Sequence, residues 1–227
     1  MDDCTLIDGT RPLGAETPVW PGDEPFKAVV AARVENEGYY LRRICFSEHA
    51  STHIDAPAHF ISNGATVDAL PPLITGWADL ALLDDLSGGK WIGRDLLAQR
   101  LPSRPRGRVL ILYNGSKWNG GDPCVHTRPL TGEAAELIVE RGYRLVVTDA
   151  PGPDCPPFPA HRVFLSRGVP IVENALIKNT IVSAFDKGVR VGVIVAPIKL
   201  SGGSGGPVRL VFLVGNGCCL PTIPQRV

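Results

Sequence analysis

The 227-residue sequence has no excess of charge of either sign, because 23 basic residues are balanced by 23 acidic ones. A chain without net charge has no overall field that would attract nucleic acid or an anionic membrane surface. We therefore expect no nucleic-acid partner. A small, roughly neutral molecule is the substrate that this composition favours.

Long apolar runs are also missing. No stretch approaches the roughly 20 apolar residues that a membrane-spanning helix needs. The chain starts MDDCTLIDGT, with two acids where a secretory leader would have basic residues. We expect neither membrane insertion nor secretion, and we predict a cytoplasmic location.

Cysteine pairs at metal-binding spacing are absent as well. The six cysteines are scattered and none forms a CxxC pair, so no zinc-knuckle pattern is present. We interpret all six as reduced thiols, as is usual in a cytoplasm. They are Cys4, Cys45, Cys124, Cys155, Cys218 and Cys219.

Short apolar or alternating runs recur along the chain and predict strands. Three of them are β-branched and do not alternate, which predicts strands covered on both faces and hence helices packed over a central sheet. The length is compatible with one domain, residues 1–227. The predicted strands are 27–34, 39–46, 109–113, 144–149, 189–198 and 208–214.

Helices are fewer: the sequence predicts them over 93–100, 131–141 and 159–167. In the second, Thr131 can cap the start and Gly142 can end it. The run SGGSGGP (201–207) joins two predicted strands and matches no phosphate-binding or dinucleotide fingerprint. We interpret it as a tight loop near the active site.

The segment SEHASTHIDAPAHF (47–60) holds three of the five histidines. Histidine and carboxylate are preferred ligands of zinc and manganese, and a hydrolytic site needs about three of them with one position left for water. His49, His53 and Asp55 can supply those three. A proline at 57 disfavours a long helix, and on an extended segment these three positions share one side.

His59 lies beyond that proline, where it can turn back as a proton carrier, since its ordinary pKa suits general acid–base work. The alternative is that these histidines are ordinary surface or hydrogen-bonded side chains on a loop.

A second candidate group is weaker on spacing alone. It comprises Asp149 at the end of a predicted strand, Asp154, His161 and Glu173. Spacing alone favours a structural role for each of them, and His126 is assigned no role.

The segment around His53 resembles the motif HxGTHxDxPxHF of the cyclase-like metal hydrolase family, which includes bacterial kynurenine formamidase and isatin hydrolase. One position departs from it, because Ser51 stands where the family has glycine, which adds a side chain beside the metal ligands. The resemblance covers nearly the whole chain. Matching residues of the motif are His49, Thr52, His53, Asp55, Pro57, His59 and Phe60.

The resemblance implies an α/β fold, a swivelling β/β/α domain with a mixed central sheet and few helices, assembled as a homodimer or homotetramer. It implies a divalent metal, zinc or manganese, with one or two ions per subunit. A second ion would be shared by Asp55, His161 and Glu173. Trp20, in PVWPGD, is implied to face the substrate.

These features predict hydrolysis of a small amide, formamide or lactam, with metal-activated water attacking a carbonyl and His59 carrying the proton. One alternative is a metal-dependent cyclase or dehydratase of a biosynthetic pathway, which would use the same site. Another is a non-catalytic binding protein of the same fold.

Overall fold

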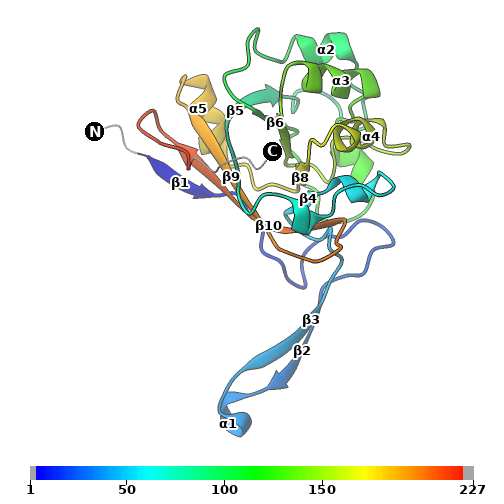
Figure 1. The fold of residues 1–227 in the computed structure, drawn as a ribbon, viewed down its shortest axis with the longest axis vertical. Helices are drawn as coiled ribbons and strands as arrows, with labels where there is room; N and C mark the ends of the chain where they lie inside the picture. The colour runs from blue at the N-terminus through cyan, green and yellow to red at the C-terminus, as the bar shows by residue number, and fades with distance from the viewer. Residues whose placement is uncertain (1–3, 222–227) are drawn as a thin grey trace.

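The central feature of the computed structural model, which describes residues 4–221, is a sheet that closes on itself (Figure 1). Its strands follow the order β1-β10-β4-β8-β7-β6-β5-β9, and β9 also pairs with β10. Seven strands therefore form a ring, and β1 pairs with β10 beside it. Their bounds are β1 Thr5–Asp8, β4 His53–Asp55, β5 Ile74–Leu82, β6 Val109–Tyr113, β7 Leu145–Thr148, β8 Ile171–Glu173, β9 Val191–Pro197 and β10 Gly205–Val214.

The sheet is mixed, as the family resemblance implied. β5, β6, β7 and β8 run parallel to their neighbours within that group, while β4, β9 and β10 pair antiparallel. Crossover helices are the usual connection between parallel strands. The prediction of buried strands at 109–113 and 144–149 is confirmed, because β7 is buried throughout and β6 is buried except at Tyr113.

Two cores lie on opposite faces of these strands, because side chains alternate along a strand. On β6, Val109 and Ile111 face the first core, to which all seven strands of the ring contribute, while Leu110 and Leu112 face a second core under the helices. Both faces of the parallel strands are thus covered, which explains their continuous apolar sequence.

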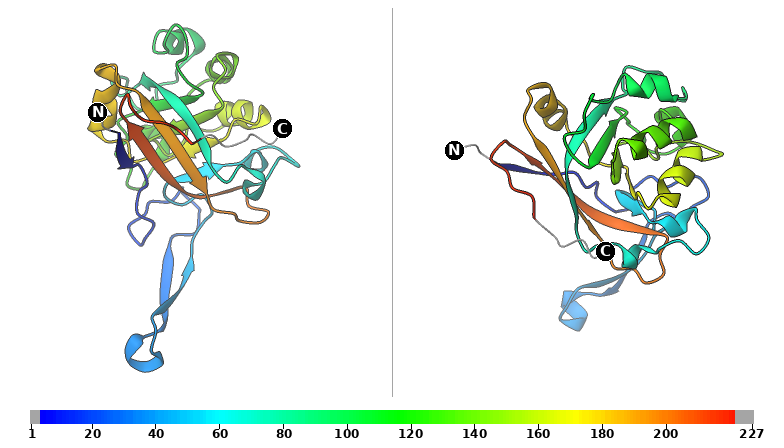
Figure 2. Two further views of the ribbon diagram at one scale, coloured as in Figure 1. Left: turned by 60° about the vertical axis from the view of Figure 1, so that its left-hand side comes forward. Right: turned by 45° about the horizontal axis from the view of Figure 1, so that its top comes forward.

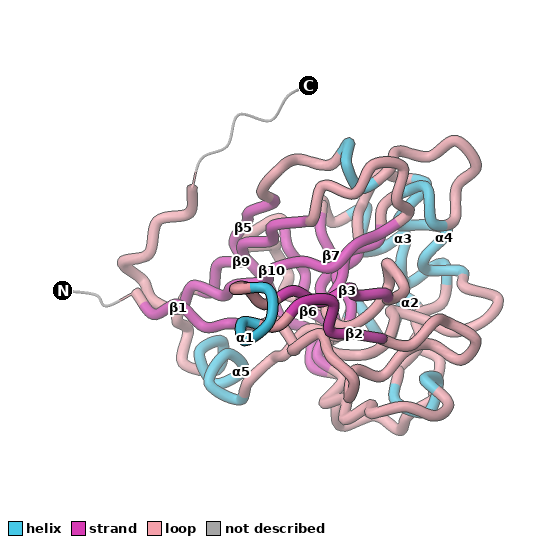
Figure 3. The backbone as a smooth tube through the Cα atoms, turned by 90° about the horizontal axis from the view of Figure 1, so that it is seen from below, coloured by secondary structure: helices cyan, strands magenta, loops and turns pink. Residues whose placement is uncertain are grey.

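Three helices that the sequence predicts cover the second core: α2 Arg94–Ala98, α3 Gly132–Glu140 and α4 Pro159–Ser166. Seen from below, α3 and α4 lie on one side of the strands and α5 on the other (Figure 3). The Thr131 side chain accepts a hydrogen bond from the Ala134 amide, and Gly142 has a left-handed φ of 90°. The predicted cap and stop of α3 are therefore confirmed.

The helix α5, Asn179–Asp186, was not predicted from sequence. Its run of Thr180, Ile181 and Val182 is β-branched and favours a strand locally. The helix forms because Ile181 and Ala184 pack into the first core, so tertiary burial decides the conformation. The strands β1, β5 and β8 were missed too. β5 carries polar interruptions such as Asp79, and β8 is only three residues long.

A hairpin of β2 Lys27–Ala32 and β3 Leu41–Cys45 forms its own two-stranded sheet and projects away from the body (Figures 1 and 2). The short helix α1, Val34–Glu37, lies at its tip. Both strands were predicted, but they are largely exposed, with Val29 at 67% and Ile44 at 54%. Three 3-10 turns complete the described elements: Pro57–His59, Val67–Ala69 and Pro123–His126.

The prediction that all six cysteines are reduced thiols is wrong for four of them. Cys4 is bonded to Cys218 and Cys124 to Cys155, which leaves Cys45 and Cys219 free and exposed. The partners are 214 and 31 residues apart in sequence, so only the tertiary structure brings them together. Over residues 4–221, no helix is both long and apolar enough to cross a membrane.

Candidate metal centre

The strand β4 carries the centre of the candidate site. It lies between β10 and β8, and its register places His53 opposite Glu173 and Asp55 opposite Gly205. His53 and Asp55 are two positions apart on a strand, so both point to the same face. The prediction of an extended segment here is confirmed for residues 53–55.

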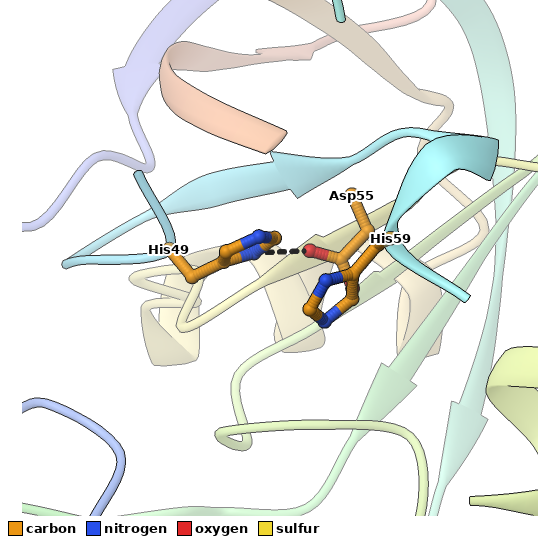
Figure 4. A group of neighbouring side chains, drawn as sticks. All are labelled: His49, Asp55 and His59. Atoms are coloured by element: carbon orange, nitrogen blue, oxygen red, sulfur yellow. Dashed lines mark hydrogen bonds and ion pairs between the residues drawn. The ribbon is translucent and has the colours of Figure 1, made fainter. Parts of the chain in front are cut away.

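A 3-10 turn, Pro57–His59, follows β4 and reverses the chain. It returns His59 toward His49, and the centroids of the two imidazole rings lie 4.0 Å apart. Figure 4 shows both rings beside the Asp55 carboxylate. The histidine cluster of the sequence is therefore a cluster in space.

Asp55 is almost fully buried and contacts three histidines of the site. Its Oδ1 lies 2.9 Å from His49 Nδ1 (Figure 4) and 3.3 Å from His53 Nε2. Its Oδ2 lies 3.5 Å from His161 Nε2. Glu173 closes the group, with Oε1 3.0 Å from His161 Nε2 and Oε2 3.5 Å from His53 Nε2.

These residues fit a divalent cation. Asp55 Oδ2 is a buried oxygen without a hydrogen-bond partner among the described residues, a state that normally costs free energy. Ligand atoms of His49, Asp55 and His59 lie within 4.8 Å of one another, as do those of His53, Asp55 and Glu173. Asp55 belongs to both groups, and imidazole with carboxylate is a donor set that zinc and manganese accept.

The rings are held in fixed orientations by groups outside the cluster. His53 Nδ1 donates to the Ser51 carbonyl at 3.0 Å, so its Nε2 is left to face the carboxylates. His161 Nδ1 is hydrogen-bonded to the buried Asp154, whose other oxygen accepts from the His161 and Ala160 amides. A carboxylate behind a histidine is the usual support of a metal ligand, since it fixes the tautomer and raises basicity.

Of the second candidate group predicted from sequence, three of the four residues come together at the site. Asp154, His161 and Glu173 meet at the site, with Asp154 behind His161. Asp149 is not among these contacts. Its carboxylate accepts hydrogen bonds from the main-chain amides of Asn114 and Ser116.

The glycine-rich run lies against the site, as the sequence predicted, but only residues 201–204 form a loop, and 205–207 begin β10. Ser204 Oγ is 2.9 Å from His49 Nε2 and also donates to Glu48. A Cβ atom at Gly205 would lie 2.5 Å from His49 Cε1. Glycine is required there because the backbone of β10 passes directly beside the His49 ring.

Ser51 replaces the family glycine at a position where the backbone is left-handed, with φ 60°. Glycine adopts this conformation freely, whereas other residues do so at a cost. The Ser51 side chain is buried and donates to the Arg11 carbonyl at 2.9 Å. In this chain the serine thus combines a left-handed backbone with a side-chain hydrogen bond.

Burial and mutual contacts shift the ionisation of the cluster in the absence of an ion. Burial alone would raise the pKa of Asp55, but its contacts with His161, His49 and His53 hold that pKa well below its ordinary value. Burial would lower the pKa of His53, yet Asp55 and Glu173 raise it to about 9. In His59 burial prevails, with help from the neighbouring histidines, and lowers the pKa to about 4. His59 is therefore neutral at pH 7 in the ion-free cluster, and it is a weaker base there than an ordinary imidazole.

A cavity of about 250 Å³ opens onto the cluster. Its walls are aromatic: Trp20 and Phe158 have ring centroids 5.9 Å apart, and Phe60 lies 4.8 Å from the His161 ring. Trp20 was named from sequence, whereas Trp118 and Phe158 were not, because nothing in their local sequence distinguishes a cavity wall from a core. Their loops meet only in the folded chain, where Cys124 and Cys155 join them.

Asn174 is another lining residue that the sequence did not single out. It follows Glu173 directly and has a left-handed φ of 53°. Its main chain is fixed by hydrogen bonds to Ala150 and from the Thr52 side chain. A strained backbone at a cavity is typical of functional sites.

The chain matches the family model described as "Putative cyclase" over residues 7–155. A kynurenine formamidase of Bacillus mycoides is 30% identical over 217 residues, which cover 93% of this chain and 99% of that protein. The kynurenine formamidase of Salinibacter ruber is 27% identical over 212 residues, covering 91% of this chain and 96% of that one.

Solved structures share the fold. Isatin hydrolase A from Labrenzia aggregata superposes with a TM-score of 0.73 at 22% identity, covering 93% of this chain and 94% of its own. Isatin hydrolase A from Ralstonia solanacearum gives a TM-score of 0.68 at 22% identity, covering 93% and 92%. The implied fold, a mixed α/β architecture with few helices, is confirmed.

Proposed function

This chain belongs to the cyclase family, and we propose that it is a metal-dependent hydrolase that cleaves the C–N bond of a small amide, formamide or lactam. One observation carries the proposal: three histidines and two carboxylates meet at an aromatic cavity, and the buried Asp55 Oδ2 among them has no hydrogen-bond partner in the described residues. The curated relatives named kynurenine formamidase support the reaction class.

The proposed ligands of a first divalent cation are His49, His53 and Asp55. Asp55 would share a second cation with His161 and Glu173. Support for two ions comes from the two oxygens of Asp55. Its Oδ1 faces His49 and His53, whereas its Oδ2 faces His161, which Glu173 also contacts. Zinc and manganese both suit these ligands, and we propose one or the other, with one or two ions per subunit.

When bound, the cation supplies Lewis acidity, which polarises the substrate carbonyl and lowers the pKa of a water. Neutral His59 accepts the proton of that water as its oxygen bonds to the carbonyl carbon. It then returns that proton to the nitrogen as the C–N bond breaks, which yields a carboxylic acid and an amine, and the acid loses its own proton to solvent. Trp20 and the other aromatic walls hold a planar substrate and exclude water from its ring.

The test combines metal content by mass spectrometry with hydrolysis of N-formylkynurenine and isatin, before and after chelation. We expect bound metal and chelator-sensitive hydrolysis. Removing one acid–base group costs typically about 10²–10⁴-fold in rate, so His59→Asn should lower kcat on that scale while the metal content stays unchanged. His53→Ala is the contrasting variant, which should lose metal as well. Metal loss from His59→Asn would instead make His59 a ligand.

The family description favours one second candidate, a cyclase or dehydratase that uses the same site without consuming water. Isotope-labelled water separates the two reactions. Incorporation of ¹⁸O into the product carboxylate supports hydrolysis, and a metal-loaded protein that converts neither test substrate points to the cyclase.

We propose that the chain forms a homodimer or homotetramer through the β2–β3 hairpin. An isolated two-stranded hairpin is only marginally stable in water. Apolar side chains on this arm are exposed, among them Tyr39 at 57% and Tyr40 at 58%. A second copy of the chain would cover them. Light scattering should give a multiple of 24.3 kDa, and a Tyr40→Asp, Ile44→Asp variant should give the monomer.

A cytoplasmic location remains a prediction. The cysteines do not support it, because four of them form two disulfides, and such bonds are rare in cytosolic proteins. Cell fractionation with detection of this chain tests the location directly.

A further inference from the structure

The glycine-rich run places one hydroxyl beside the candidate metal centre. Ser204 lies between two glycines at which an added side chain would crowd the site. A Cβ atom at Gly203 would lie 2.9 Å from Glu48 Oε2, and one at Gly205 would lie 2.5 Å from His49 Cε1. The two glycines therefore let the main chain bring Ser204 into contact with two consecutive residues, Glu48 and His49.

Main-chain hydrogen bonds fix this part of the loop. The Ser204 carbonyl accepts from the Ala56 amide at 2.9 Å, and the Gly203 carbonyl accepts from the Val67 amide, also at 2.9 Å. Ala56 directly follows the candidate ligand Asp55. The serine is thus held to the same segment that carries the candidate ligands.

Glu48 determines the direction of the hydrogen bond between Ser204 and His49. The Glu48 Oε1 atom accepts from the Ser204 amide at 3.0 Å and from the Ser204 hydroxyl. A carboxylate can only accept, and a hydroxyl has a single proton, so the hydroxyl proton of Ser204 is committed to Glu48. Ser204 Oγ therefore meets His49 Nε2, 2.9 Å away, with a lone pair, and Nε2 carries the proton of that bond.

A neutral imidazole that is protonated at Nε2 presents the lone pair of Nδ1. In His49 this Nδ1 faces Asp55 Oδ1 at 2.9 Å, inside the candidate site (Figure 4). His53 and His161 have the opposite arrangement, because their Nδ1 atoms are hydrogen-bonded outside the cluster and their Nε2 atoms face its carboxylates. Each candidate histidine ligand thus has its own partner behind the ring.

We propose that Ser204 and Glu48 are positioning residues for His49. Glu48 orients the Ser204 hydroxyl, which accepts from His49 Nε2 and so presents Nδ1 to a bound cation. Such support fixes the tautomer and the ring orientation of a metal ligand and raises its basicity. Asp154 supports His161 directly, whereas the carboxylate of Glu48 acts through a hydroxyl. This inference rests on the proposed function, since His49 is one of the ligands proposed there.

Competition with a chromogenic chelator measures the zinc affinity of the protein and its variants. Ser204→Ala should weaken zinc binding about 10–100-fold, the usual effect of losing such a partner. Glu48→Gln should weaken it about threefold to tenfold, because the bond to Ser204 loses its charge. Ser201→Ala and Glu136→Gln are the matched controls and should bind zinc as the wild type does, since both residues are exposed, Ser201 in the same run and Glu136 on α3.

A double-mutant cycle shows whether Glu48 acts through Ser204 or directly. Glu48 Oε1 is also 3.7 Å from His49 Nε2, so a direct electrostatic effect is the competing explanation. If Glu48 acts through the hydroxyl, Glu48→Gln should have no further effect on zinc affinity in the Ser204→Ala background. Additive effects of the two substitutions would refute the positioning role of Glu48.

The imidazole nitrogens of the zinc-loaded protein provide a measurement that a general loss of stability would not change. Long-range ¹H–¹⁵N spectra should show His49 protonated at Nε2, and His53 and His161 protonated at Nδ1. His49 protonated at Nδ1 would overturn the proposal, as would unchanged zinc affinity in Ser204→Ala.

Neither measurement depends on turnover. Zinc binding with the expected tautomer and the expected variant affinities, but without hydrolysis of any amide, would sustain the positioning role and refute the proposed reaction. Hydrolysis that is sensitive to chelation, together with wild-type zinc affinity in Ser204→Ala, would do the reverse. A wild-type protein that binds no zinc would overturn the positioning role and the zinc site together.

Discussion

Replacing Ser51 by alanine and by glycine separates two opposing contributions at one position. Ser51 has a φ of 60°, which costs an L-residue about 1–2 kcal/mol. Its buried hydroxyl offsets this by donating to the main-chain oxygens of Arg11 and Pro12. Alanine keeps the strained backbone and removes the donor, whereas glycine removes the donor and the strain together.

The expected magnitudes follow from these terms. Loss of the donor removes the hydrogen bond to the Arg11 carbonyl and costs about 0.5–1.5 kcal/mol in either variant. Glycine relieves the backbone strain, which stabilises the folded state by about 1–2 kcal/mol. Its more flexible unfolded chain lowers the stability by about 0.4–1 kcal/mol. We therefore expect Ser51→Ala to be the less stable variant by about 1 kcal/mol, or about 2–4 °C in Tm for a chain of this length.

Urea unfolding of the metal-free protein, with chelator present, measures both free energies without a contribution from metal binding. Asn63 provides the control, because it is another non-glycine residue with a left-handed φ, 59°, and it is exposed. Asn63→Gly against Asn63→Ala gives the backbone term alone. If Ser51→Ala equals or exceeds Ser51→Gly in stability while the Asn63 pair shows the backbone term, the reasoning about Ser51 is refuted.

Four further outcomes are expected. Asp154→Asn should weaken metal binding about 10–100-fold through loss of the support behind His161, and unchanged affinity by competition with a chelator would contradict this role. Cys124→Ser should lower the unfolding free energy by up to about 4 kcal/mol, because the bond to Cys155 closes a loop of about 30 residues; the same Tm in reduced and oxidised wild-type protein would show that the bond does not form. In the metal-free protein the pKa of His53, about 9, exceeds its ordinary 6.5, so its contribution to stability is full below pH 6.5 and lost as pH rises toward 9. Metal affinity should do the opposite and rise with pH, with proton release visible by calorimetry in buffers of different ionisation enthalpy.

Local sequence determined the elements whose residues suffice to specify them. The buried strands β6 and β7 follow from β-branched apolar runs, and α3 follows from its cap at Thr131 and its stop at Gly142. The core of the candidate metal site follows from sequence in the same way, because His53 and Asp55 lie on one face of one strand. The short range of these interactions is the reason: every partner is within a few residues.

Tertiary structure decided whatever depends on partners far along the chain. It determined that α5 is a helix despite its β-branched residues, that Cys4 meets Cys218, and that Asp154 stands behind His161 rather than among the ligands. It also assembled the cavity wall from loops that share no sequence pattern. Distance along the chain carries no record of such contacts, since they form only when burial of the two cores closes the sheet and brings these segments together.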